Sequence, residues 1–155
     1  MPYAAGRTYY DADSHIMELS EWIVDYADPG VREKIRPLYL GAAGKLAENA
    51  VSEAAERKGD PAKARALEEN VMGPKGWGAL GAFDSAERSR ALDLLGFHKQ
   101  LVFSTFAATQ FMGDDEELLY GGARALNRAM ADFCSDDARM VTGHSLVVDG
   151  GQIFR

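Results

Sequence analysis

Three side chains that can bind a metal ion alternate along a short segment of the chain. Asp11, Asp13 and His15 are separated by single residues in the order Asp-Ala-Asp-Ser-His. Alternate residues of a β-strand point to the same face, so this spacing predicts two carboxylates and an imidazole on one face. Such a set can bind divalent ions, including zinc, manganese and magnesium. Solvated or turn-capping residues at a strand end have the same spacing, and both interpretations stay open.

The segment that carries these side chains has the composition of a buried strand. Thr8 to Ile16 begins with β-branched and aromatic residues and ends with short polar ones. Lys99 to Phe106 and Met140 to Val148 are similarly apolar and predict a second and a third strand.

Helices are expected before and after the second strand. Asp84 and Glu87 have the spacing of a capping box, and Gly96 marks the end of that helix. Asp114 begins another capping box and a helix over 114–134. Helices that alternate with strands are typical of parallel architecture, so we predict an α/β fold with about three parallel strands.

A helical insertion is expected over about 41–72. The segment 45–72 is rich in Ala, Glu, Lys and Arg, and Asp60-Pro61 predicts two helices that are broken near Gly59. Its apolar stripe is thin, which fits an exposed helical hairpin or a partly disordered segment.

A glycine-rich loop follows the insertion. Residues 73–81 contain four glycines and one proline, and Trp77 lies among them. Trp77 and Phe106 are candidates for the wall of a substrate pocket. A tryptophan that fills the core from a loop is an equally good interpretation.

Length and charge exclude several classes of function. The 155 residues fall short of the roughly 250 of a complete eight-fold β/α barrel. A net charge of -7 without a Lys/Arg cluster argues against a nucleic-acid partner. No apolar run could span a membrane or act as a signal peptide, so a cytoplasmic location without membrane contact is expected. Cys134, the only cysteine, is expected in the core.

Several ordered blocks of the sequence resemble one enzyme family. YDADSHIMEL (10–19), GWGALGAFDSAERSRALDLLGFHKQLVFSTF and ELLYGGARALNRAMADFC are similar to the amidohydrolase-related family that includes the carboxymuconate-semialdehyde decarboxylases. The resemblance covers Thr8 to about Ala138. It implies a distorted eight-fold β/α barrel with one divalent metal, usually zinc. It also implies hydrolysis or non-oxidative decarboxylation of small carboxylated or ring substrates.

This resemblance assigns metal-ligand roles to few residues of the chain. The family's first strand carries two metal ligands as His-x-His, and the matching positions are Asp13 and His15, with Asp11 as a further candidate. Aspartate in place of the first histidine favours manganese or magnesium over zinc. The relatives' other ligands and catalytic base lie on later strands. No catalytic residue is therefore assigned, and the chain is expected to be inactive alone.

The other two histidines are weaker candidates. His98 is expected between the helix and the second strand, at the bottom of a barrel, as a structural or exposed residue. His144 lies in the third expected strand and could face the same side as His15.

The C-terminal part resembles a different family. Ser135 to Gly151 (SDDARMVTGHSLVVDGG) is similar to the end of the short-chain dehydrogenases. Their Gly-x-x-x-Gly-x-Gly and Tyr-x-x-x-Lys motifs are missing, so no nicotinamide cofactor is expected. The chain thus divides into a partial (β/α) barrel fragment over 1–139 and a dehydrogenase-like strand and tail over 140–155.

Three strands cannot close a barrel, so their free edges predict a homo-oligomer. Two alternatives to the amidohydrolase-type function stay open. The chain could be a non-catalytic assembly module or chimeric remnant, or a small-molecule binding protein that uses the pocket at Trp77 and Phe106.

Overall fold

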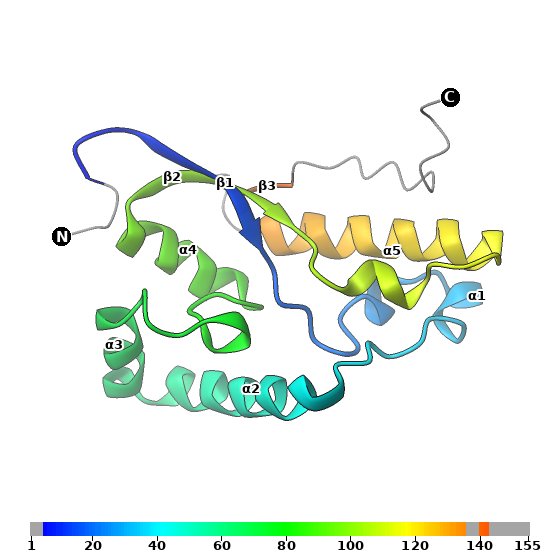
Figure 1. Cartoon of the computed structure of the whole chain (residues 1–155), viewed down its shortest axis with the longest axis horizontal. Helices are drawn as coiled ribbons and strands as arrows, with labels where there is room; N and C mark the ends of the chain where they lie inside the picture. The colour runs from blue at the N-terminus through cyan, green and yellow to red at the C-terminus, as the bar shows by residue number, and fades with distance from the viewer. Residues whose placement is uncertain (1–4, 136–139, 143–155) are drawn as a thin grey trace.

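A short parallel sheet with helices around it forms the centre of the computed structural model, which describes residues 5–135 and 140–142 (Figure 1). Its strands are β1 (Tyr9–His15), β2 (Phe97–Phe103) and β3 (Met140–Thr142), in the spatial order β1-β2-β3. Both neighbouring pairs are parallel. The predicted α/β fold with parallel strands is confirmed. Within the described residues the sheet is open and forms no barrel.

The described residues form five α-helices: α1 (Pro29–Arg32), α2 (Gly44–Gly59), α3 (Pro61–Glu69), α4 (Ser85–Leu95) and α5 (Glu116–Ser135). Short 3-10 turns connect them: η1 (Val24–Tyr26), η2 (Gly41–Ala43), η3 (Gly76–Gly78) and η4 (Ala107–Gln110). Helix α4 contacts β2, and α5 contacts β3, η1, η4 and α1. Helices α2 and α3 contact each other and run along the lower edge of Figure 1.

Two helix starts follow the local sequence. Asp84 Oδ1 accepts the backbone N–H of Glu87 at 3.0 Å, and Gly96 ends α4 with a φ of +80°. This left-handed conformation favours glycine and turns the chain directly into β2. Asp60 caps α3 by accepting the backbone N–H of Ala62 at 2.9 Å. The predicted start of each helix and the predicted end of α4 are therefore confirmed, whereas α3 ends at Glu69, before the predicted limit at residue 72.

Two predicted boundaries are wrong by a few residues. Strand β2 begins at Phe97, not Lys99, which places His98 within the strand. Helix α5 begins at Glu116, and its cap is Asp115 in place of Asp114. Asp115 Oδ1 accepts the backbone N–H of Leu118 at 3.1 Å. Asp115 is therefore the N-cap that the sequence predicted at Asp114.

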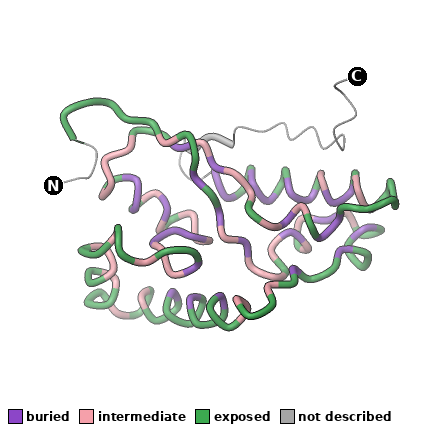
Figure 2. Tube along the Cα trace, in the orientation of Figure 1, coloured by how far each residue is buried: buried purple, intermediate pink, exposed green. Residues whose placement is uncertain are grey.

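The insertion is an ordered and largely exposed helical hairpin. The only described residues of α2 that are buried are Ala47, Ala50 and Ala54, and no described residue of α3 is buried. Figure 2 shows this contrast with the inner side of α5, where buried residues recur along the helix. The hairpin and the break near Gly59 are both confirmed.

The main core lies between the sheet, α5 and the segment after β1. Its fully buried side chains include Ile16, Ile23, Leu92, Phe111 and Leu126. A smaller cluster joins Trp77 to Ala47 and Ala50 of α2. Within the described part of the chain, no helix is long and apolar enough to cross a membrane. His144 and most of the dehydrogenase-like tail lie outside the described residues.

Candidate functional site

The pairing register of β1 shifts between Asp11 and Ser14. Asp11 pairs with Gln100, and Ser14 pairs with Val102, so three steps along β1 match two along β2. Gln100 and Val102 are two residues apart and share a face of the sheet. Asp11 and Ser14 therefore share that face, and Gln100 Nε2 donates to Asp11 Oδ2 at 3.0 Å.

The shift separates Asp11 from the other two candidate ligands. Asp13 and His15 flank Ser14 along the strand, and so lie on the face opposite Asp11. The prediction that all three side chains share one face is wrong, because an extra residue in one strand reverses the alternation. Asp11 instead accepts the backbone N–H of Asp13 at 3.1 Å through its Oδ1, and its role as a further ligand stays a prediction.

Asp13 and His15 lie side by side at the C-terminal end of β1. Asp13 Oδ1 is 3.5 Å from His15 Nε2. Their side chains are 92% and 47% exposed, so the pair is open to solvent. In the described part of the chain, no three His, Cys, Asp or Glu side chains are grouped so that they could hold a metal ion.

The other ring nitrogen of His15 faces the end of β2. His15 Nδ1 is 3.3 Å from Thr105 Oγ1, and that hydroxyl donates to the carbonyl of Ile16 at 2.6 Å. The His15 ring also lies against the Phe103 ring, with centroids 5.7 Å apart. Phe103, the last residue of β2, and Thr105, two residues later, therefore contact the imidazole, while its Nε2 faces Asp13.

A fully buried carboxylate, Glu18, connects the ends of both strands. It accepts a hydrogen bond from Ser104 Oγ and from the backbone N–H groups of Thr105 at 2.7 Å, Phe106 at 3.1 Å and Ala107 at 3.3 Å. These donors form the start of η4, where backbone N–H groups lack helical partners. Glu18 thus fixes the loop that carries Thr105.

Sequence reasoning missed Glu18, although a signal was present. The residue stands inside the apolar run Ile-Met-Glu-Leu. A charge in such a run is costly unless several donors satisfy it. That pattern could have indicated a structural carboxylate.

Trp77 and Phe106 lie in the smaller core cluster. Their rings stack with centroids 5.8 Å apart at 13°, and Trp77 is buried. Trp77 Nε1 donates to the backbone carbonyl of Glu18 at 3.1 Å. This position fits a tryptophan that fills the core from a loop, and the substrate-pocket role of Trp77 and Phe106 stays a prediction.

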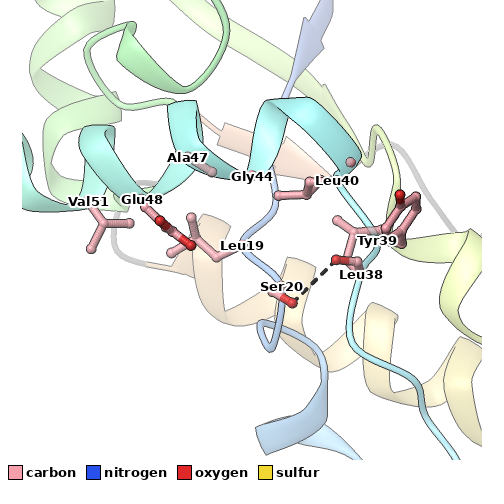
Figure 3. Close-up of a pocket in the computed structure, with 10 residues that line it drawn as sticks. Leu19, Ser20, Leu38, Tyr39, Leu40, Gly44, Ala47, Glu48 and Val51 are labelled. Carbon is pink, nitrogen blue, oxygen red and sulfur yellow. Dashed lines mark hydrogen bonds between the residues drawn. The ribbon is translucent and has the colours of Figure 1, made fainter.

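A separate groove of about 490 Å³ lies beside α2 (Figure 3). Leu19, Leu38, Leu40 and Val51 supply apolar wall, and Glu48 adds a carboxylate. Ser20 Oγ donates to the carbonyl of Leu38 at 3.3 Å, which joins the two loops of the groove. This groove was not predicted, because it forms between segments that are distant in the sequence.

His98 and Cys134 lie apart from Asp13 and His15. His98 is exposed and meets the Tyr10 ring edge to face, with centroids 5.7 Å apart. Cys134 is buried, as predicted, and this burial raises the pKa of its thiol. An inert core thiol is consistent with both observations.

Comparison with protein-family models, with curated proteins and with solved structures found no match for this chain.

Proposed function

We propose that this chain is part of an amidohydrolase-type, metal-dependent hydrolase or decarboxylase and cannot complete the reaction alone. The observation that carries this proposal is the Asp13–His15 pair at the C-terminal end of a parallel strand. Parallel β/α proteins perform their chemistry at that end of the sheet. The resemblance to the amidohydrolase-related family also implies that the pair matches that family's His-x-His ligands.

The separation of the two side chains fits shared ligation of one ion. Two donors at about 2.1 Å from the same ion lie roughly 3 to 3.5 Å apart, and His15 Nε2 is 3.5 Å from Asp13 Oδ1. One carboxylate and one imidazole suit manganese or magnesium as well as zinc.

Two donors are too few for a catalytic metal centre, which needs at least three protein ligands in the zinc case. The described residues supply no third His, Cys, Asp or Glu side chain beside the pair. We therefore assign no catalytic step to this chain and infer that it is a partial (β/α) barrel fragment. A second copy of the chain would supply the missing ligands, and the substrate would be a small carboxylated or ring compound.

Metal titration tests the proposed ligands. Calorimetry with Mn²⁺ and Zn²⁺ should show binding that is lost in Asp13→Ala and in His15→Ala. His98→Ala is a matched control, because it removes an exposed strand histidine outside the pair. Equal binding in all four proteins, or no binding to the wild type, contradicts the proposal.

A non-catalytic assembly module is the second candidate. Among the described residues, strand β1 is an edge strand in the order β1-β2-β3, and Tyr10 on it is 64% exposed. An unpaired strand edge can pair with another chain. Size-exclusion chromatography with light scattering should show a dimer or larger assembly. A folded monomer at micromolar concentration contradicts this candidate, and also the shared site proposed above.

The groove beside α2 favours a third candidate, a small-molecule binding protein. Its volume falls within the range of ligand pockets, and its walls are mainly apolar. Ligand-observed NMR with small apolar compounds should detect binding that Val51→Arg abolishes. Identical spectra with and without the protein contradict this candidate.

A further inference from the structure

The hydroxyl of Thr105 has only one hydrogen to donate. Its Oγ1 lies 2.6 Å from the carbonyl oxygen of Ile16, and a carbonyl can only accept. The hydrogen of Thr105 is therefore directed to Ile16. The contact at 3.3 Å between the same Oγ1 and His15 Nδ1 must use a lone pair of the hydroxyl oxygen.

This assignment decides which ring nitrogen of His15 carries the proton. Nδ1 has to donate to Thr105 Oγ1, so it bears the hydrogen. A neutral imidazole has one N–H, which leaves a free lone pair on Nε2. Nε2 is the atom that lies beside Asp13.

We propose that Thr105 is a positioning residue, which holds neutral His15 as the Nδ1–H tautomer and directs its Nε2 lone pair, with Asp13, toward a divalent cation. The cation part of this inference rests on the proposed function. The tautomer part depends only on the hydrogen bonds of Thr105. Metal-binding histidines commonly donate their other ring N–H to a neighbouring acceptor in this way.

The alternative tautomer would need a hydrogen bond from Nε2–H to Asp13. The Nε2 to Oδ1 separation is 3.5 Å, and both this contact and the Thr105 contact are longer than the usual N–H···O range of about 2.7–3.2 Å. The contact with Thr105 at 3.3 Å is the shorter of the two.

Glu18 fixes the backbone position of Thr105. Its buried carboxylate accepts the Thr105 backbone N–H at 2.7 Å and binds the residues on either side. The backbone of the loop cannot move away from His15 without breaking these bonds, and the bond from Oγ1 to the Ile16 carbonyl holds the Thr105 side chain in its rotamer. Thr105 is therefore held by the core although its own side chain is exposed.

Nitrogen-15 NMR of the histidine rings tests the tautomer in the full chain without metal. The spectra are recorded at a pH where the same data show His15 to be neutral. Wild-type His15 should show a protonated Nδ1 and an unprotonated Nε2. Thr105→Val removes the acceptor and should shift His15 toward Nε2–H, which is the tautomer that free histidine prefers in water. Thr105→Ser keeps the hydroxyl and should restore the wild-type pattern.

His98 provides an internal control in each spectrum, because it lies on β2 away from Thr105 and its signals should not change. Urea unfolding of each variant shows whether the fold is kept. A wild-type His15 that is mainly Nε2–H, or a Thr105→Val spectrum equal to wild type, overturns the inference.

Mn²⁺ titration then separates this inference from the proposed function. Thr105→Val should weaken Mn²⁺ binding about tenfold, as loss of a partner behind a ligand commonly does. Thr105→Ser should bind as the wild type does. If no protein binds Mn²⁺ but the tautomer follows Thr105, the proposed metal site fails and the positioning role is supported. If Mn²⁺ binds equally to wild type and Thr105→Val with an unchanged tautomer, the positioning role fails and the metal site is supported.

Discussion

Glu18 accepts the backbone N–H of Thr105 at 2.7 Å across 87 positions of the sequence. The contact joins the segment after β1 to the segment after β2, at the edge of the sheet where His15 lies. Glu18 is completely buried, and it accepts the backbone N–H groups of Thr105, Phe106 and Ala107. The geometry beside His15 therefore depends on a residue that itself touches no ligand candidate.

Glu18→Gln should lower the free energy of unfolding by about 2 kcal/mol, because hydrogen bonds to a charged acceptor contribute about 1.5–3 kcal/mol. The amide that replaces the carboxylate also turns donors toward the N–H groups of the loop. Urea denaturation measures the change. Glu21→Gln removes an exposed carboxylate from the next turn and should stay within about 0.5 kcal/mol of wild type. Equal losses in the two variants would show that the buried bonds contribute nothing specific.

Tyr26 should make stability depend on pH in the alkaline range. Its hydroxyl donates to Asp132 Oδ2 at 2.5 Å, and this bond, followed by burial, raises the pKa of Tyr26 from 10.0 to about 12. The folded protein thus keeps a proton that the unfolded chain loses first. The stabilisation is complete below pH 10 and is lost as the pH rises toward 12.

Tyr26→Phe should remove this pH dependence. Denaturant midpoints of wild type and variant should differ at neutral pH and converge as the pH passes 12. Absorbance titration of tyrosinate should show one late-ionising group in wild type that is missing in Tyr26→Phe. Tyr39→Phe, at a residue that is 92% exposed, is the control and should retain that group. A constant midpoint difference across the whole range would rule out the proposed linkage.

The sequence predicts local features of this fold well. Asp84 and Gly96 bound α4 as expected, because an N-cap and a left-handed C-cap depend on neighbours within one turn. Asp60 starts α3 for the same reason. The alternation of helix and strand likewise predicts the parallel sheet, since two parallel strands need a connection of this kind.

The candidate site is predicted only in part, because its geometry depends on long-range pairing. The spacing places Asp13 and His15 together, but it cannot show the register shift that turns Asp11 to the other face. That shift depends on how β1 pairs with β2, some 90 residues later. No sequence pattern predicts the contact of Thr105 with His15, because it depends on the loop that Glu18 holds.

Gly122→Ala should destabilise the protein although alanine is the better helix former. A Cβ at this position of α5 would lie 2.2 Å from Cγ of Phe111, a fully buried side chain. Overpacking of this kind costs about 1–3 kcal/mol, which exceeds the gain of about 1 kcal/mol in helix propensity. Thermal unfolding should show a lower midpoint.

Gly44→Ala is the matched control for that substitution. Gly44 has helical dihedral angles at the start of α2, and a Cβ there meets no atom within 4 Å. This variant should be more stable by about 0.4–1 kcal/mol, because alanine restricts the unfolded chain. A gain of stability in both variants would show that α5 can move away from Phe111 without cost.

Arg88 should be coupled to Ser14 in a double-mutant cycle. Its buried guanidinium donates to Ser14 Oγ at 2.9 Å and to the carbonyl of His15 at 2.6 Å, and lies 5.8 Å from the Phe133 ring. Burial disfavours the charged form of Arg88 and lowers its pKa, and these contacts offset that cost. Arg88→Met keeps much of the side-chain volume but leaves both acceptors on β1 without this donor.

Arg88→Met should therefore lower the free energy of unfolding by roughly 2–3 kcal/mol, since a buried acceptor without a partner costs about 1–3 kcal/mol. Ser14→Ala should cost less in the Arg88→Met background than in wild type, because the hydroxyl has then already lost its partner. The difference between the two values, measured by urea denaturation, should be about 1 kcal/mol. Strict additivity would mean that the bond between Arg88 and Ser14 contributes nothing, so that Arg88 acts through the His15 carbonyl and the Phe133 ring.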